Sequence, residues 1–384
     1  MKYKLKDICS KITDGSHNPP QGISDSPYLM LSSKNIADDS ITYDNPRYLT
    51  EADFLLENKR TSIQEGDLLL TIVGTIGRVA VVSNIEKKLC LQRSVAVLKP
   101  KQDIVKSRYL MYYLQNMRPV LEAEAKGVAQ KGIYLKQVES IEVSVPSLSK
   151  QEEIVNNLDL VTKLLALQKM QLVHLDELVK SRFIELFGDT ILNPFGWEKD
   201  SLGAVCDVRD GTHDSPQYYE TGYPLVTSKN VTGGKIDLTD CSLICEADFK
   251  KINERSKVDI GDIIMPMIGT VGKPVIVDVE PVFAIKNVAL IKFKTNSKVL
   301  NIYIRALLQS DYFDDAVLSK VRGGTQKFIS LGDIRKLSVL VPPMELQEQF
   351  ATFVKQTDKS KLAVQNSIAE LEELKKSLMQ KYFG

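Results

Sequence analysis

The stretch "DLLLTIVGTIGRVAVV" at residues 67–82 returns in a closely similar form as "DIIMPMIGTVGKPVIV" at residues 262–277. Each copy places Gly-Thr-x-Gly between two runs rich in β-branched residues. A phosphate-binding loop would need a helix after the glycines, whereas a second strand-like run follows here. The pattern therefore predicts a tight β-hairpin in each copy. We expect positive φ angles at its glycines, which are Gly74, Gly77, Gly269 and Gly272.

The hairpin is one part of a tandem repeat that fills the chain. "TDGSH" (13–17) returns as "RDGTH" (209–213), "SSKNI" returns as "TSKNV", and "EADF" occurs twice, all at offsets between 193 and 197. This period is too long for a solenoid of short repeats. The sequence therefore predicts a duplicated module, with one copy in residues 1–188 and the other in 197–384.

Each copy has two unlike parts. Residues 1–150 and 197–346 alternate short β-branched runs with turns and a helical stretch, which is typical of a mixed α/β (α+β) domain rather than a parallel doubly wound sheet. Residues 151–188 and 347–384 have the pattern of long helices. A linker at 189–196 joins the two copies.

The helical parts show the spacing of a coiled-coil seam. The first seam consists of Ile154, Leu158, Val161, Leu165, Gln168, Leu172, Leu175 and Val179. The second consists of Phe350, Val354, Thr357, Lys361, Val364, Ile368, Leu371, Lys375 and Leu378. Ser149 and Glu152 suggest a capping box at the start of the first helix, and Gly188 suggests its end.

The short linker decides the direction of pairing. Eight residues reach at most about 29 Å, whereas a helix of this length extends about 55 Å. The second domain must therefore begin near the end of the first helix. We expect antiparallel helices, one globular domain at each end and pseudo-twofold symmetry.

The composition excludes several classes of protein. The formal net charge of +1 gives no overall basic field, and no apolar run is long enough for a membrane span. The five cysteines fit a reducing cytoplasm better than a disulfide framework. Cys241 and Cys245 are too few for a zinc site and are interpreted as ordinary thiols. No cofactor or nucleotide fingerprint is apparent, so we expect a non-catalytic chain without a cofactor or a metal.

The Asp-Gly-Ser/Thr-His motifs contain residue types found in hydrolases. A catalytic triad, however, assembles from separate segments, and its nucleophile would change from Ser16 to Thr212 between the copies. We interpret the motifs as Asx-type turns, with a DNA-facing polar loop as the alternative. A hydrolase that uses Asp210 and His213 is the least favoured interpretation.

Polar loops supply the candidates for DNA contact. "KGVAQKGI" (126–133) and "RGGTQKFI" (322–329) place Gly, Gln and basic residues before an expected amphipathic strand, and such side chains suit base edges and phosphates. A solvated loop is the alternative. The candidates of the first copy are Ser16, His17, Lys34, Asn35, Thr75, Arg78, Lys126, Gln130 and Lys131. Those of the second copy are Thr212, His213, Lys229, Asn230, Thr270, Lys273, Arg322, Gln326 and Lys327.

Together these motifs resemble the specificity subunit of type I restriction–modification systems. The resemblance rests on the order of domain, helix, domain and helix, and on "TDGSH", "SSKN", "EGDLLLTIVGTIG", "VDIGDIIMPMIGTVG" and "GGTQKFISLGDI". It covers essentially the whole chain. It implies two target-recognition domains, each of which reads one half of a split sequence in double-stranded DNA.

The same resemblance implies the division of labour. The helices would set the spacing between the half-sites and dock two methyltransferase subunits, with restriction subunits joining the complex. Chemistry and S-adenosylmethionine would belong to those partners. The alternatives are a related bipartite system with a fused methyltransferase–nuclease partner, a stand-alone hydrolase or methyltransferase, and a coiled-coil scaffold.

Overall fold

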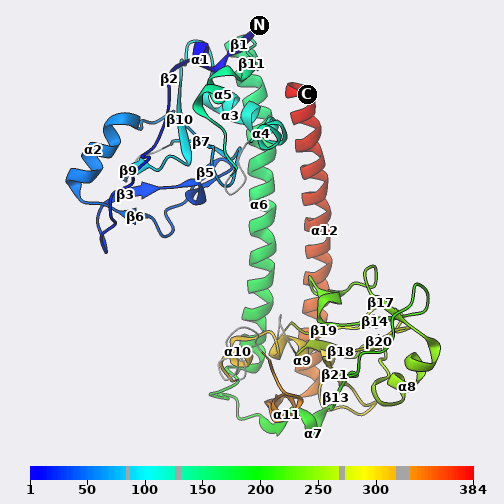
Figure 1. Ribbon diagram of the computed structural model, residues 1–384. Coiled ribbons are helices and arrows are strands. Elements are labelled where there is room, and N and C mark those ends of the chain that lie inside the picture. Colours follow the sequence, from blue (N-terminus) through cyan, green and yellow to red (C-terminus); the bar gives the residue numbers. More distant parts are fainter. Residues whose placement is uncertain (84–86, 126–130, 268–272, 317–327) are drawn as a thin grey trace. The chain divides into compact units, whose positions relative to one another are not determined.

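The computed structural model describes residues 1–83, 87–125, 131–267, 273–316 and 328–384 (Figure 1). The chain divides into two compact units. Unit 1 contains Met1–Lys169 and Asn366–Gly384, and unit 2 contains Met170–Gln365. We call the α/β part before the first long helix domain 1, and the α/β part between the two long helices domain 2. Each unit thus combines one domain with parts of both long helices.

The elements follow the same order in both domains. Domain 1 consists of β1 (Lys2–Lys4), α1 (Leu5–Ile8), β2 (Cys9–Asp14), β3 (Tyr28–Leu31), η1 (Ser33–Asn35), β4 (Ile36–Ala37), β5 (Ser40–Ile41), β6 (Arg47–Tyr48), α2 (Glu51–Thr61), β7 (Leu68–Thr71), β8 (Val79–Val81), β9 (Lys88–Leu91), β10 (Val95–Pro100), α3 (Ser107–Asn116), α4 (Arg118–Glu124), α5 (Leu135–Ser140) and β11 (Glu142–Ser144). Domain 2 consists of β12 (Glu198–Ser201), α7 (Leu202–Val205), β13 (Asp207–Asp210), β14 (Tyr223–Val226), η2 (Ser228–Asn230), β15 (Val231–Thr232), β16 (Lys235–Ile236), β17 (Ser242–Ile244), α8 (Glu246–Ser256), β18 (Ile263–Pro266), β19 (Val275–Ile276), β20 (Ala284–Ile285), β21 (Val288–Lys292), α9 (Asn301–Leu307), α10 (Asp311–Ala316), α11 (Leu331–Arg335) and β22 (Ser338–Val341). The long helices are α6 (Leu148–Phe187) and α12 (Met344–Phe383).

The sheets confirm the mixed α/β fold and the duplication. Domain 1 has an antiparallel sheet in the order β2-β10-β7-β8 and a second sheet, β6-β3-β9, in which β3 and β9 run parallel. Domain 2 repeats both as β13-β21-β18-β19 and β17-β14-β20, with β14 parallel to β20. The same topology therefore occurs twice.

The Gly-Thr-x-Gly motif of domain 1 is the predicted hairpin. Strands β7 and β8 pair antiparallel, with Leu68 opposite Val81. Gly74 and Gly77 have φ angles of 83° and 79°, which favour glycine. No helix follows the glycines, so a phosphate loop is excluded here. In domain 2, β18 and β19 pair in the same way, whereas Gly269 and Gly272 lie outside the described residues.

The apolar run in β7 reflects a sheet that is buried on both faces. Successive side chains of a strand point to opposite faces. Leu68 and Leu70 join a core that includes Leu158 of α6, whereas Leu69 joins a second core with Leu31 of β3. The sheet is therefore held between the helices on one side and the smaller sheet on the other.

The long helices begin earlier than the sequence indicated, at Leu148 and Met344 instead of residues 151 and 347. The capping box at Ser149 is wrong, because Ser149 lies within the helix. Instead, the hydroxyl of Ser147 accepts a hydrogen bond from the backbone N–H of Lys150 at 3.4 Å. Ser147 follows Pro146 in the short connection between the end of β11 at Ser144 and the start of α6. Gly188 ends the helix as predicted, with a φ angle of 77°.

The predicted seams are confirmed, since every seam residue of α6 and α12 is buried or half-buried. The polar seam residues of α12 meet charges. Lys361 forms an ion pair with Asp176 at 2.6 Å. Lys375 is half-buried near Asp39 and Asp159, and burial lowers the pKa of this lysine. These contacts explain how α12 carries lysines in an otherwise apolar seam.

The helices pair antiparallel within each unit. In unit 1, the amide of Asn157 donates to the hydroxyl of Tyr382 at 3.0 Å, and Lys169 meets Glu372 at 2.9 Å. As the residue number rises on α6, the partner's number falls on α12. In unit 2, the same relation holds between the Lys361–Asp176 pair and the rings of Phe183 and Phe350, whose centroids are 5.6 Å apart.

The last turn of α12 completes the core of domain 1. The ring of Phe383 lies 5.5 Å from that of Tyr109 and 5.6 Å from that of Tyr113, centroid to centroid. Leu378 and Tyr382 pack against the same core. Segments from the two extremes of the sequence therefore share one hydrophobic core.

A buried glutamine fastens each domain to its long helix. The side chain of Gln151 is fully buried; it accepts from the N–H of Lys106 at 2.8 Å and donates to the carbonyls of Ile104 and Pro146, both at 3.0 Å. Gln347 makes the equivalent contacts in unit 2. Because buried polar groups need partners, these side chains fix the angle at which each domain meets its helix.

Candidate nucleic-acid interface

The polar motifs of domain 1 meet at one edge of the main sheet. The N–H of Arg93 donates to the carbonyl of Ser16 at 2.8 Å, and the N–H of Ser33 donates to the hydroxyl of Ser94 at 3.0 Å. The carbonyl of Ser94 also accepts from the N–H of Ile72 at 2.9 Å. We call this region loop edge 1; it comprises residues 15–18, 32–35, 72–78, 92–94 and 131–133.

Domain 2 repeats this arrangement. The N–H of Asn287 donates to the carbonyl of Thr212 at 3.2 Å, and the N–H of Lys286 donates to the carbonyl of Val226 at 2.9 Å, which brings the Thr-Ser-Lys-Asn turn to the same place. The N–H of Ile329 donates to the carbonyl of Met267 at 3.0 Å. Loop edge 2 comprises residues 211–215, 227–230, 267, 273, 286–287 and 328–329.

The glycine of each Asp-Gly motif permits a close backbone approach. A Cβ atom on Gly15 would lie 2.1 Å from the carbonyl oxygen of Leu91, and one on Gly211 would lie 2.4 Å from that of Ile285. Real Cβ atoms do not come so close, so no side chain fits at either position. The glycines hold the loop against the end of β9 or β20, which fixes the histidine two residues later.

The aspartate before each glycine is a buried anchor. Asp14, at the end of β2, forms an ion pair with Arg60 of α2 and faces the Nε2 of His17 at 2.9 Å. Asp210 contacts Arg255 of α8 and the Nε2 of His213 in the same way. The expected Asx-type turn is wrong, because the backbone N–H groups of Ser16 and Thr212, which such a turn would direct at the aspartate, donate instead to the carbonyls of Leu91 and Ile285. Each anchor orients an exposed histidine.

The sequence interpretation missed Arg60 and Arg255. Both lie in the last turn of the helix that begins with the repeated "EADF", within "EADFLLENKR" and "EADFKKINER". An arginine retained at the same place in both copies was a signal that could have identified them. Arg93 and Ser94 were also missed, because their loop, "QRS", becomes "KN" in the second copy and so escapes detection as a repeat.

The asparagines of the Ser-Lys-Asn turns face inward. Asn35 accepts from the N–H of Ser32 and donates to the carbonyl of Asp44, each at 3.0 Å. Asn230 makes the same pair of contacts in domain 2. Both side chains are buried, whereas the neighbouring Lys34 and Lys229 are exposed. The turn therefore uses its asparagine for structure and presents its lysine to solvent.

The remaining candidates fall into three groups. Exposed on the loop edges are His17, Thr75, Lys131, His213 and Lys273. Ser16 is buried, and Thr212 and Arg78 are half-buried, with a guanidinium nitrogen of Arg78 lying 3.5 Å from the carbonyl of Ile36. Lys126, Gln130, Thr270, Arg322, Gln326 and Lys327 lie outside the described residues.

The segments after the Gln-Lys loops differ from the expectation. In place of an amphipathic strand, helix α5 begins at Leu135 and helix α11 at Leu331. The hydroxyl of Ser330 accepts from the N–H of Asp333 at 3.1 Å and caps α11. Such a cap satisfies an N–H that the first turn leaves free, which favours a helix at this point.

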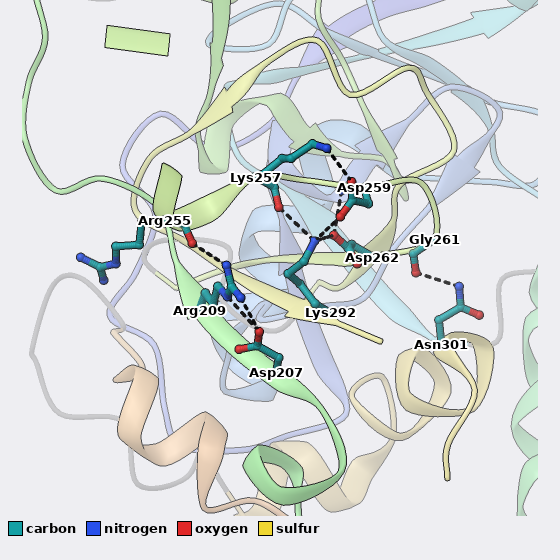
Figure 2. Close-up of polar contacts among 9 residues, drawn as sticks. All are labelled: Asp207, Arg209, Arg255, Lys257, Asp259, Gly261, Asp262, Lys292 and Asn301. Atoms are coloured by element: carbon teal, nitrogen blue, oxygen red, sulfur yellow. Dashed lines mark hydrogen bonds and ion pairs between the residues drawn. The ribbon is translucent and has the colours of Figure 1, made fainter. Parts of the chain in front are cut away.

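A second polar cluster in domain 2 is internally satisfied (Figure 2). The ammonium of Lys292 contacts Asp262 at 2.5 Å, Asp259 at 2.7 Å and the carbonyl of Lys257 at 2.9 Å. Burial raises the pKa of Asp262, while the hydrogen bond from Lys292 lowers the pKa of Asp259. Lys99 and Asp67 repeat the central pair in domain 1. Because these charges partner one another, we interpret them as supports of the Gly-Asp turn.

The cysteines are free thiols, as predicted for Cys241 and Cys245. Burial raises the pKa of Cys9, Cys90 and Cys206 to about 12, so these thiols are protonated at neutral pH. Among the described residues, no group of three or more His, Cys, Asp or Glu side chains is placed to hold a metal ion. In the same part of the chain, no helix has both the length and the apolar character needed to cross a membrane.

The comparisons with known proteins agree with the duplicated fold. A family model described as "Type I restriction modification DNA specificity domain" matches residues 1–176 and 194–375. The MjaVIII specificity subunit of a type I restriction enzyme from Methanocaldococcus jannaschii is 24% identical over 344 residues, which cover 84% of this chain and 80% of that protein. The EcoBI specificity subunit from Escherichia coli is 33% identical over 106 residues, or 27% of this chain and 22% of that protein.

Solved structures show the same fold. The type I restriction–modification S subunit from M. genitalium superposes with a TM-score of 0.58 at 14% identity, covering 100% of this chain and 96% of that chain. A chain from a study of assembly and conformational transition in a type I system gives 0.59 at 18% identity, covering 100% and 97%. The chain belongs to the family of type I restriction–modification DNA specificity subunits.

Proposed function

We propose that each domain recognises one half of a bipartite target in double-stranded DNA through its loop edge. The observation that carries this proposal is the duplication of the loop edge itself. In both domains a buried aspartate, paired with an exposed arginine, orients an exposed histidine, and the loop edge also carries an exposed lysine of the Ser-Lys-Asn turn. Residues shared by both copies suit the phosphate backbone, which is common to both half-sites.

The chain itself neither methylates nor cleaves DNA in this proposal. Two methyltransferase subunits and, in the full complex, restriction subunits supply the chemistry in the cytoplasm. An uneven exposure of the long helices supports partner docking. Large apolar side chains are exposed on α6 at Leu160, Leu164, Leu167, Met170, Val173, Leu178 and Ile184, whereas α12 exposes Leu362 and Leu374. Exposed apolar residues at such density indicate an interaction surface.

Methylome sequencing tests the proposed function. Cells that carry the chain together with its partner subunits should show a methylated bipartite motif, and the motif should disappear when the gene for this chain is deleted. The purified chain alone should show no methyl transfer. Methylation that persists without the chain, or robust methyl transfer by the chain alone, would rule the function out.

Matched insertion of one heptad in both long helices should lengthen the unspecified spacer of the target. A heptad preserves the seam and adds roughly 10 Å, which corresponds to about three base pairs at about 3.4 Å each. Because DNA also rotates by roughly 100° over that distance, we expect growth by one to about three base pairs. Methylome sequencing of the lengthened variant measures the spacer.

The control for this insertion replaces one heptad of each helix by another of equal length. It should leave the spacer and both half-sites unchanged. An active, lengthened variant with an unaltered spacer would show that the helices do not set the distance.

A further inference from the structure

Arg93 belongs to loop edge 1, and its charged side chain is available to a ligand. Its backbone N–H donates to the carbonyl of Ser16 at 2.8 Å, so its side chain starts beside His17. The residue is exposed, and among the described residues its guanidinium has neither a hydrogen-bond partner nor an ion-pair partner. An arginine without a carboxylate keeps all its donors for a ligand.

Among the described residues, His17 has a hydrogen-bond partner for only one of its two ring nitrogens. Its Nε2 faces the carboxylate of Asp14 at 2.9 Å, and a carboxylate can only accept. In the neutral ring the proton therefore sits on Nε2, and Nδ1 is an acceptor without a partner among the described residues. Arg93 and His17 thus leave donors and one acceptor open at the same point of the loop edge.

At the equivalent place in domain 2, the histidine has a partner for each of its ring nitrogens. Asn287 makes the backbone contact that Arg93 makes in domain 1, with its N–H on the carbonyl of Thr212. Its side-chain oxygen, however, lies 2.9 Å from the Nδ1 of His213, whose Nε2 faces Asp210. Asn287 also has a φ angle of 54°, a conformation that asparagine tolerates. Both ring nitrogens of His213 are therefore occupied.

The two loop edges therefore share some polar side chains and differ in others. Lys34 and Lys229 occur in both copies and suit phosphates. Arg93 stands where domain 2 has Asn287, and among the described residues its side chain has no partner there. Arginine pairs with the O6 and N7 of guanine in the major groove. We propose that Arg93 reads a guanine in the half-site of domain 1, with the Nδ1 of His17 beside it; this rests on the proposed function.

The test is methylome sequencing of cells that carry Arg93→Ala in the full complex. The domain 1 half-site should lose its preference at one guanine. The ratio of methylation at sites with another base there to methylation at the original site should be about 10- to 100-fold higher than in the wild type. The other half-site should stay the same. Arg93→Gln should shift the preference at that position towards adenine, because glutamine pairs with adenine.

Two controls accompany these variants. Lys6→Ala removes an exposed cation in α1, the helix that precedes β2, and should change neither half-site. Asn287→Ala probes the equivalent position in domain 2 and should leave the domain 1 half-site intact. The thermal unfolding of each variant, compared with that of the wild type, reports whether the fold is retained.

The outcomes separate this inference from the proposed function. A uniform loss of methylation at an unchanged motif would show that Arg93 meets phosphate, which overturns the inference. A wild-type half-site without guanine, or an unchanged motif and rate in both Arg93 variants, also overturns it. Absence of any bipartite motif in the wild type would instead remove the proposed function.

Discussion

Phe187→Ala should lower the free energy of unfolding of unit 2 by about 3–5 kcal/mol, the usual cost of such a cavity. Phe187 is fully buried at the end of α6. Its ring centroid lies 4.8 Å from that of Tyr303 on α9 and 5.5 Å from that of Phe350 on α12. The substitution therefore removes the ring at which both long helices meet domain 2. Denaturant unfolding measures the loss.

The single tryptophan of the sequence reports on this region, since the indole N–H of Trp197 donates to the carbonyl of Phe187 at 3.1 Å. Phe195→Ala is the matched control. Phe195 lies nearby in the linker but is 53% exposed, so its removal should change stability by less than about 0.5 kcal/mol. Equal losses in the two variants would show that the aromatic cluster does not hold the helices to the domain.

Gln347→Leu should cost about 3 kcal/mol or more of the free energy of unfolding of unit 2. The buried side chain accepts from the N–H of Leu300 at 2.8 Å and donates to the carbonyls of Lys298 and Pro342 at 3.0 and 2.9 Å. Leucine can make none of these contacts. Each buried polar group left without a partner costs about 1–3 kcal/mol. The same denaturant titration measures the change.

Gln349→Leu provides the comparison for this variant. It makes the same chemical change in the same turn of α12, but at an exposed position. Its stability should stay within about 0.5 kcal/mol of the wild type. If Gln347→Leu were equally harmless, the glutamine would not fasten domain 2 to its helix, and the equivalent role of Gln151 in unit 1 would also fall.

Local patterns predicted much of this fold. The alternation around Gly74 and Gly77 predicted the hairpin, because glycine supplies the positive φ angles that such a turn needs. Heptad spacing predicted the seams, and the length of the linker predicted antiparallel pairing. These features depend on neighbours in the sequence or on chain geometry, so one sequence is enough to identify them.

Long-range partners could not be predicted in this way. Nothing near Asp14 indicates that Arg60 will meet it, because the fold of domain 1 brings the two segments together. The inward turn of Asn35 also depends on a distant carbonyl, that of Asp44. Candidate DNA contacts were therefore chosen by residue type alone. The structure separates the exposed Lys34 from its buried neighbour and adds Arg93, which no repeat marked.

The contact between Phe383 and domain 1 has a consequence for biosynthesis. A ribosome completes residues 1–169 long before it reaches Asn366–Gly384, although both segments build unit 1. Until then, the rings of Tyr109 and Tyr113 lack their partner. Unit 2 is continuous in sequence and can close first. The domain that is translated first should therefore reach its native core last, and the nascent chain needs protection from aggregation throughout that interval.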